Sequence, residues 1–281
     1  MYRNHFGFSR QPFSLTPNSD FFYGLAPHYE AIQTVLSALE MGEGLIKISG
    51  EVGTGKTMVC RMLVNELDAK VALIYLPNPV LSAEQLRQAV AKELAITATS
   101  DASLVDDIQA KLIDIHAQGR KAVVLVDEAQ ALSDETLEAL RLFGNLETEQ
   151  SKLLQMVLIG QPELDERLAQ RHLRQFRQRI TFSAQLRALS LAETVAYINH
   201  RLEIAAGSES IIPLMQKKAI WRSSRGIPRL INQLCHKALL LTFTDNQNNV
   251  DNRHLYLAIS DTFDVCKPKF KTPCLWGWSQ P

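Results

Sequence analysis

The chain has 281 residues, in which 30 Lys and Arg balance 30 Asp and Glu. This length favours one large domain or two of moderate size, and it can bury a sizeable core without disulfides or metals. The hydrophobic content of 46% and the charged content of 21% exclude wholesale disorder. A net charge of zero lacks the basic excess that marks many nucleic-acid-binding domains, but it does not exclude a local basic patch.

Cysteine usage and hydropathy indicate the compartment. The four cysteines form no CxxC pair, so we interpret them as free thiols and expect neither a disulfide framework nor a zinc site. The amino terminus lacks an apolar signal core, and no apolar run reaches the roughly 18 residues of a membrane span. We therefore expect a cytoplasmic protein that reaches the inner membrane only through a partner.

Short β-type runs alternate with helical patterns over the first two thirds of the chain. The expected strands span residues 45–49, 71–76, 122–126, 153–159 and 180–186. The expected helices between them span residues 56–67, 82–95, 103–117 and 134–146. This alternation predicts βαβ units and hence an α/β layered domain with a parallel sheet.

After Leu189 the β-type runs stop and only helical patterns continue. These patterns span residues 191–206, 214–224, 228–243 and 251–262. We therefore predict three parts: an α/β core over 1–189 that includes an amino-terminal segment 1–44, a small all-α domain over 190–265, and a tail over 266–281.

The most specific motif is a glycine-rich loop between the first expected strand and the helix after it. Residues 50–57 match G-x-x-x-x-G-K-[ST]. The glycines let successive amides point inward as an anion site, which the amino terminus of the helix completes. We expect Lys56 to contact the β- and γ-phosphates of a nucleotide and the Thr57 hydroxyl to bind Mg²⁺. The expected nucleotide-binding residues of this motif are Gly50, Glu51, Val52, Gly53, Thr54, Gly55, Lys56, Thr57 and Met58.

A second motif follows the apolar run at 122–126, where Asp127 and Glu128 stand. They fall at the carboxyl edge of the expected parallel sheet, where α/β sheets bind ligands. Asp127 suits the Mg²⁺ ion, and Glu128 suits polarising a water for attack on the γ-phosphate. The alternative is an acidic pair that caps the next helix. With the phosphate loop, the pair predicts a nucleoside triphosphatase.

Several separated motifs resemble, in the same order, those of the AAA+ ATPases and more narrowly of the ExeA/GspA secretion ATPases. Besides the loop at 50–57, they are Phe6-Gly7-Phe8, Gln11-Pro12-Phe13, Thr16-Pro17-Asn18, Phe22-Tyr23, His28-Tyr29-Glu30-Ala31, Asp127-Glu128-Ala129-Gln130 and Gly160-Gln161-Pro162-Glu163-Leu164. The resemblance covers most of the chain. It implies a three-layer αβα P-loop core with a helical lid, and ATP and Mg²⁺ as its ligands.

The resemblance also implies roles for residues outside the two motifs. Gln161 takes the position of the first sensor residue, which in AAA+ proteins is more often Asn, Thr or Ser. Arg229, within residues 226–229, takes the position of the lid arginine that contacts the nucleotide phosphates of its own subunit; the alternative is a solvated arginine. Asn78 matches an Asn that holds the catalytic Glu inactive in some AAA+ proteins.

Five arginines precede the last expected strand: Arg167, Arg171, Arg174, Arg177 and Arg179. By resemblance, Arg179 is an arginine finger that reaches the γ-phosphate of a neighbouring subunit, with Arg174 and Arg177 as alternatives. A finger requires an oligomer, so we expect ATP to promote a ring or partial ring. The competing interpretations are DNA-phosphate binding by one helical face, formed by Arg167, Arg171 and Arg174, and a solvated face without function.

The resemblance implies an ATPase that powers or regulates assembly of a bacterial envelope machine with an inner-membrane component as partner. The machine is the MSHA type IV pilus or a related type II secretion system. ExeA continues into a membrane span and a peptidoglycan-binding region, whereas this chain ends soon after the expected lid, which favours the pilus. The alternatives are a DNA-linked AAA+ ATPase of the transposition-regulator type and a scaffold that binds nucleotide without turnover. The neutral charge makes a nucleic-acid partner the less favoured of these.

The tail combines lysines with two of the three tryptophans, Trp276 and Trp278. Such a segment is compatible with docking on a membrane interface or in a partner groove. The alternative is a frayed terminus.

Overall fold

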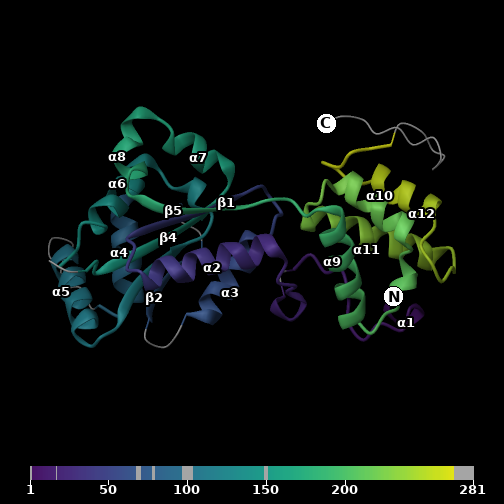
Figure 1. Cartoon of the computed structure of the whole chain (residues 1–281), viewed down its shortest axis with the longest axis horizontal. Helices are drawn as coiled ribbons and strands as arrows, with labels where there is room; N and C mark the ends of the chain where they lie inside the picture. Colours follow the sequence, from purple (N-terminus) through teal and green to yellow (C-terminus); the bar gives the residue numbers. More distant parts are fainter. Residues whose placement is uncertain are drawn as a thin grey trace. The chain divides into compact units, whose positions relative to one another are not determined.

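A computed structural model of the chain describes residues 2–16, 18–67, 71–77, 80–96, 104–148 and 151–268. The chain divides into two compact units, and Figure 1 shows their elements along the sequence. The helical unit contains Met1–Leu25, Gly53–Gly55 and Arg187–Pro281, and the α/β unit contains Ala26–Val52 and Lys56–Leu186.

The α/β unit is built on a parallel sheet that has five strands within the described residues, in the order β2-β3-β4-β1-β5. The strands are β1 (Leu45–Gly50), β2 (Val71–Leu76), β3 (Lys121–Val126), β4 (Leu154–Gly160) and β5 (Ile180–Leu186). In the register of the ladder, Ser49 of β1 pairs with Gly160 of β4, and Val126 of β3 pairs with Leu158 of β4. The residues that follow β1, β3 and β4 therefore meet at one edge of the sheet.

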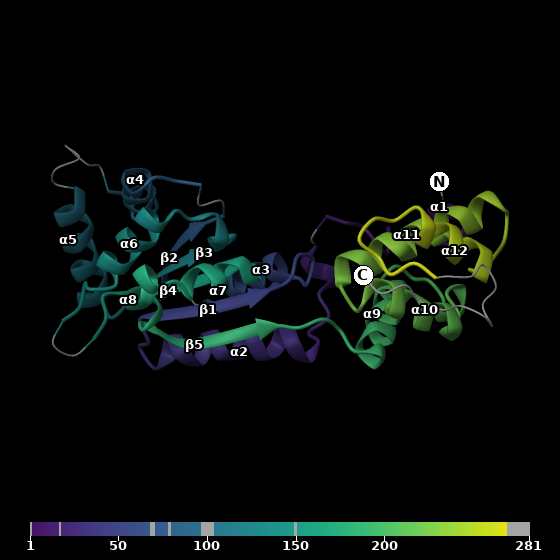
Figure 2. The ribbon, with the colours of Figure 1, turned by 90° about the horizontal axis from the view of Figure 1, so that it is seen from above.

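Helices connect these strands and cover the sheet (Figure 2). In chain order they are α2 (Ala26–Glu40), α3 (Lys56–Glu66), α4 (Ala83–Glu93), α5 (Leu104–Ala117), η2 (Ala129–Ala131), α6 (Asp134–Phe143), α7 (Pro162–Leu168), η3 (Arg171–Leu173) and α8 (Arg174–Arg177). Every residue of β4 is buried, which requires helices on both faces of the sheet. The predicted α/β fold with a parallel sheet is confirmed, while α2 and α7 are helices that the sequence patterns did not predict.

The apolar core of the α/β unit lies between the sheet and α4, α5 and α6. Its fully covered side chains include those of Ile74, Val124, Leu158, Leu86, Ile108, Leu112, Leu137 and Leu140. Because the strand interiors are filled with such side chains, polar chemistry is confined to the ends of the strands.

The helical unit packs its own apolar core. Its helices are α1 (Tyr2–His5), η1 (Ser19–Phe21), α9 (Leu191–Ile204), η4 (Glu209–Ile211), α10 (Leu214–Ser224), α11 (Pro228–Thr244) and α12 (Asn252–Ser260). Apolar residues of α9, α10, α11 and α12 meet in one buried cluster, which includes Ile198, Leu202, Ile220, Leu234 and Leu255. This cluster accounts for the 3.6-residue periodicity of the predicted helices.

Residues 1–25 belong to the helical unit, whereas the sequence analysis grouped the whole segment 1–44 with the α/β core; residues 26–44 do belong to the α/β unit. Apolar side chains of residues 1–25 enter the buried cluster of the helical unit; they are Tyr2, Phe8, Phe13 and Leu25. Arg201 of α9 is 6% exposed, donates a hydrogen bond from Nε to the carbonyl oxygen of Pro12 at 2.7 Å, and lies 4.9 Å from the ring centroid of Phe21. Phe8 and Phe13 of the amino-terminal motifs therefore have a structural role, because they bury apolar surface of the helical unit that would otherwise face water.

An ion pair at the first turn of α9 makes the stability of the folded chain depend on pH. Ser190 and Glu193 form a reciprocal cap, and both Glu193 carboxylate oxygens accept hydrogen bonds from Arg187 at 2.8 and 2.9 Å. These bonds hold the pKa of Glu193 at about 2, against an ordinary value of 4.5. Because the folded pKa is depressed, the stabilisation is complete above pH 4.5 and is lost as the pH falls toward 2.

Glu193→Gln is therefore expected to lower the free energy of unfolding at pH 7 by about 1 kcal/mol, because it removes the charge-assisted bonds to Arg187. Solvent around the half-exposed Arg187 weakens this ion pair and keeps the effect small. The difference from the wild type should shrink between pH 4.5 and pH 2 in urea titrations. Glu203→Gln on the exposed face of α9 is the matched control. A difference that stays constant over this pH range would contradict the assignment.

Candidate active site

The glycine-rich loop turns between β1, which ends at Gly50, and α3, which begins at Lys56. Gly53 and Gly55 have φ angles of 82° and 105°, which other residues rarely adopt. The Lys56 side chain is buried, and its Nζ donates hydrogen bonds to the carbonyl oxygens of Gly50 at 2.7 Å and of Glu51 at 3.0 Å. Burial lowers the pKa of Lys56, while neighbouring carboxylates act in the opposite direction. The loop thus fixes an ammonium group at the edge of the sheet.

Asp127 and Glu128 directly follow β3 at the same edge. The Asp127 N–H donates to the carbonyl oxygen of Leu76, the last residue of β2, at 3.0 Å, and burial raises the pKa of the Asp127 carboxyl. Glu128 has a φ of 54° and a ψ of 39°, a left-handed conformation that is uncommon for a residue other than glycine and concentrates at functional sites. Its side chain makes no capping hydrogen bond to η2, so the capping interpretation is wrong for Glu128.

Gln161 follows β4 and reaches the same carboxylate. Its Nε2 donates a hydrogen bond to Glu128 Oε2 at 3.1 Å. Gln130 takes part in the same network, because its Nε2 donates to Glu128 Oε2 at 2.5 Å and its Oε1 accepts from the Gln161 N–H at 3.0 Å. The sequence analysis gave Gln130 no role. The available signal was its position two residues after Glu128, within reach of that side chain in a tight turn.

The residues at this edge could hold a magnesium ion that arrives with a nucleotide. Among the described residues, no cluster of three His, Cys, Asp or Glu side chains could hold a metal by itself. The hydroxyl of Thr57 and the carboxylate of Asp127 form a sparse oxygen donor set. Mg²⁺ uses such a set when phosphate oxygens and water complete its coordination.

A comparison with protein families identifies this region. Residues 39–168 match a family model described as an AAA domain. This stretch of the chain is therefore similar to AAA domains. The phosphate loop, the acidic pair, Gln130 and Gln161 all lie inside the matched residues.

A curated relative extends the similarity beyond the AAA domain. The chain is homologous to the general secretion pathway protein A of Aeromonas hydrophila, with 41% identity over 261 residues. The match covers 92% of this chain and 48% of the relative. The chain therefore spans about half the length of that protein.

Solved structures show how the AAA domain and the helices after it compare with known folds. The ORC2 protein of Aeropyrum pernix matches with a TM-score of 0.65 at 15% identity, over 92% of this chain and 73% of that chain. A RuvB protein of Thermotoga maritima matches with a TM-score of 0.51 at 15% identity, over 89% of this chain and 73% of that chain. At this identity the likeness concerns the fold alone. It confirms the AAA+ P-loop fold followed by carboxyl-terminal helices.

The predicted lid arginine, Arg229, is the second residue of α11 in the helical unit, which also contains Gly53–Gly55 of the phosphate loop. The backbone N–H of Arg229 donates to the carbonyl oxygen of Gly53 at 3.2 Å. A Cβ on Gly53 would lie 2.7 Å from the Cβ of Arg229, so this approach also requires glycine. The role of the Arg229 guanidinium toward phosphates stays a prediction.

Arg179, the predicted finger, lies at the amino end of the sheet. It precedes β5, whose first residue pairs with Leu45, the first residue of β1, whereas the phosphate loop follows the last residue of β1. At a rise of about 3.3 Å per residue, the two ends of β1 lie roughly 17 Å apart. Arg179 Nη1 donates to the carbonyl oxygen of Arg141, near the end of α6, at 3.3 Å. The structure therefore does not bring Arg179 together with the phosphate loop of its own chain.

Arg167 is already bound inside the α/β unit. Its Nη1 donates to the carbonyl oxygens of Gln130 at 3.0 Å and Leu132 at 2.5 Å, and its Nη2 forms an ion pair with Asp134. It therefore does not present a free guanidinium for a DNA-binding face. The side chains of Arg171, Arg174 and Arg177 are exposed.

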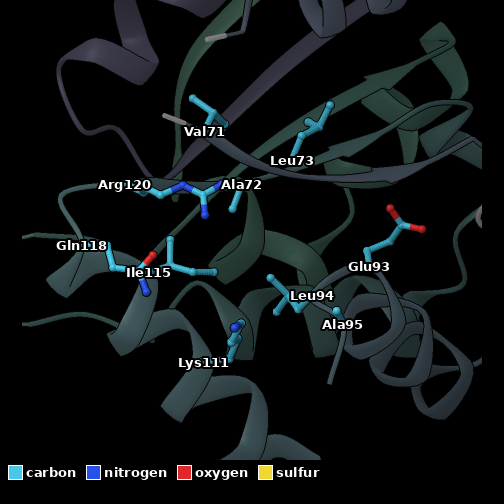
Figure 3. Close-up of a pocket in the computed structure, with 10 residues that line it drawn as sticks. All are labelled: Val71, Ala72, Leu73, Glu93, Leu94, Ala95, Lys111, Ile115, Gln118 and Arg120. Carbon is cyan, nitrogen blue, oxygen red and sulfur yellow. The ribbon is translucent and has the colours of Figure 1, made fainter. Parts of the chain in front are cut away.

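A cavity of about 350 Å³ opens at the amino end of β2 (Figure 3). Its walls come from β2, from the ends of α4 and α5, and from the turn before β3; its lining residues are Val71, Ala72, Leu73, Glu93, Leu94, Ala95, Lys111, Ile115, Gln118 and Arg120. None of the predicted site residues lines this cavity, because the site of the AAA domain occupies the carboxyl ends of the strands. The cavity is therefore separate from the candidate active site.

Asn78 and residues 269–281 of the tail, which include both tryptophans, lie outside the described residues, so the predictions for them stay predictions. In the part of the chain that the structure does describe, no helix combines the length and hydropathy that a membrane crossing requires.

Proposed function

We propose that this chain is an Mg²⁺-dependent ATPase. The observation that carries the proposal is the placement of Lys56, Asp127, Glu128 and Gln161 at the carboxyl ends of three adjacent strands, β1, β3 and β4. Parallel α/β sheets bind their ligands at this edge. The ORC2 protein, which shares the fold, has been solved with ADPNP and ADP.

The phosphate-binding residues have distinct parts in the proposed reaction. Bound Mg²⁺ would neutralise charge that develops on the phosphates. Thr57 and Asp127 hold the ion, Lys56 exchanges its loop carbonyls for the β- and γ-phosphates, and the loop amides bind the remaining oxygens. By its resemblance to the lid arginine, Arg229 is proposed to contact the nucleotide phosphates.

Glu128 is the proposed general base. Its carboxylate orients a water and accepts a proton from it during attack on the γ-phosphate. Gln161 donates to the same carboxylate, and its resemblance to the first sensor residue supports a contact between its amide and the γ-phosphate. These roles separate binding by the loop from activation of the attacking water.

Lys56→Ala is expected to weaken ATP binding at least about tenfold and to abolish hydrolysis, because it removes a charge-assisted bond to the phosphates. Equilibrium titration with a fluorescent ATP analogue and a phosphate-release assay measure the two effects. Lys92→Ala on the exposed side of α4 is the control. Turnover at the wild-type rate in Lys56→Ala would contradict the proposal.

We further propose that ATP hydrolysis powers or regulates assembly of a bacterial envelope machine. The support is the homology with general secretion pathway protein A. The proposed machine is the MSHA type IV pilus, with this chain as an MshM-like ATPase, or a related type II secretion system. The proposed partners are a second copy of this chain and an inner-membrane component of the machine.

The DNA-linked alternative has less support. An ORC1 protein of Aeropyrum pernix was solved in complex with DNA, but its 17% identity with this chain carries the fold alone. The bonds of Arg167 within its own unit also remove one of the three arginines of the proposed DNA face.

Affinity capture from native cells separates these functions. Glu128→Gln should retain ATP and trap the assembled state, so we expect it to recover inner-membrane pilus or secretion components. The control is Lys56→Ala, which should recover less of them. Recovery of DNA or a transposase would instead support the transposition-regulator alternative.

A further inference from the structure

We propose that Gln130 is the positioning residue of this site: it holds the Glu128 carboxylate by one oxygen and leaves the other oxygen for the attacking water. The inference rests on the proposed ATPase function and adds a residue to it. It follows from the hydrogen bonds around Glu128 and from how firmly Gln130 itself is held.

Two amides converge on a single oxygen of Glu128. Gln130 Nε2 and Gln161 Nε2 both donate to Oε2, at 2.5 and 3.1 Å. Among the described residues, no hydrogen bond reaches Oε1. An acidic side chain anchored through one oxygen keeps a fixed orientation, so its other oxygen can accept a proton from a water at a defined place.

Gln130 is fixed at both ends, as this role requires. Its Oε1 accepts the Gln161 N–H at 3.0 Å, which sets the orientation of its amide so that Nε2 points to Glu128. Its backbone carbonyl oxygen accepts from Arg167 Nη1 at 3.0 Å. The network therefore ties the turn after β3 to the end of β4 and to α7.

The end of β4 leaves room for this side chain. A Cβ on Gly160 would lie 2.9 Å from Leu164 Cδ2, 3.3 Å from Gln130 Oε1 and 3.4 Å from the Gln130 backbone nitrogen. Glycine at position 160 thus gives Leu164 and Gln130 room at the end of the strand. The Gln130 side chain makes two hydrogen bonds, whereas the Gln161 side chain makes one among the described residues.

The first test uses nucleotide-free protein. In a sample labelled with ¹⁵N-glutamine, the side-chain amide of Gln130 should exchange its protons slowly with solvent, and Gln130→Leu identifies the signal by its loss. Glu128→Ala should accelerate that exchange, while the amide of Gln118, which donates to Asp114 at 3.0 Å on the exposed surface, should not change. Free exchange of the Gln130 amide in the wild type would overturn the proposal.

The second test measures catalysis. Gln130→Leu should lower kcat by about 10- to 100-fold and change the dissociation constant for ATP by less than about twofold, as is typical when an outer-shell partner is lost. Gln130→Asn, which keeps an amide but is too short to span both partners, should act in the same direction. Gln118→Leu is the matched control, because it also loses an amide–carboxylate bond, and it should keep the wild-type kcat.

The outcomes distinguish this inference from the proposed function. If the wild type hydrolyses ATP and Gln130→Leu does so at the same rate, the positioning role is wrong and the ATPase proposal stands. If the wild type shows no turnover, the ATPase proposal fails and the catalytic role of Gln130 fails with it. In that case slow exchange of its amide would mark a structural bond only.

Discussion

Glu128→Gln should abolish ATP hydrolysis while leaving ATP binding intact. The substituted amide keeps the size of the side chain but cannot accept a proton from water, and general-base catalysis typically contributes 10²- to 10⁴-fold to the rate. The binding groups, Lys56, Thr57 and Asp127, are unchanged by the substitution. We therefore expect kcat to fall by at least about 100-fold and the dissociation constant for ATP to stay within about threefold.

The backbone conformation at position 128 accommodates Gln as well as Glu. Glu128 has a left-handed φ of 54°, and Gln meets the same steric limits there as Glu does, so the substitution adds no backbone strain. Phosphate release and nucleotide titration on the same preparation measure the two constants. Glu84→Gln at the exposed start of α4 is the matched control. A variant that loses binding and hydrolysis together would show that Glu128 acts on nucleotide affinity instead.

Arg179→Ala should also abolish hydrolysis, but for a reason that involves a second copy of the chain. Arginine fingers contribute about 10³- to 10⁵-fold in related phosphoryl transfers. Arg179 lies at the amino end of the sheet, one strand length from the phosphate loop of its own chain. A catalytic contribution from Arg179 therefore requires the γ-phosphate of a neighbouring copy.

Mixing two inactive variants tests this requirement. Arg179→Ala has an intact loop and base, whereas Glu128→Gln has an intact Arg179, so mixed assemblies should regain part of the lost turnover. Arg171→Ala, at an exposed position in the same cluster, should behave as the wild type. Unchanged turnover in Arg179→Ala would rule out the finger at this position. Failure of the mixture to regain activity would contradict action between copies.

The sequence patterns predicted the five strands of the α/β unit and the four helices after Leu189, but not α2, α7 or the place of residues 1–25 in the helical unit. The strand preceding Asp127 was recognisable because a continuous apolar run is typical of a buried parallel strand. The strand preceding Gly50 was recognisable as a short β-type run that ends at a glycine. The segment before Ala26 was misassigned, because its aromatic residues show no periodicity and their partners in α9 and α11 lie far along the chain.

The hydrogen bonds around Glu128 also join residues that are far apart in the sequence, so the sequence did not predict them. Gln130 and Gln161 are 31 positions apart, and nothing in the local sequence indicates that the side chain of one binds the backbone of the other. Parallel pairing of β3 with β4 brings them together at the sheet edge. Similarly, the sequence placed Arg167 on a helical face with Arg171, whereas its ion pair with Asp134 depends on how α7 packs.

The sequence by itself indicated the candidate site and the fold: a glycine-rich loop after one strand, an acidic pair after another, and an order of helices and strands that is typical of a P-loop fold. These features are local, because strand, turn and helix propensities act over a few residues. Only the tertiary structure decided which oxygen of Glu128 is anchored, which unit covers the amino-terminal aromatics, and which end of the sheet carries Arg179. Those outcomes depend on strand order and on packing between residues that are distant in sequence, where burial and hydrogen bonding rather than propensity select the partner.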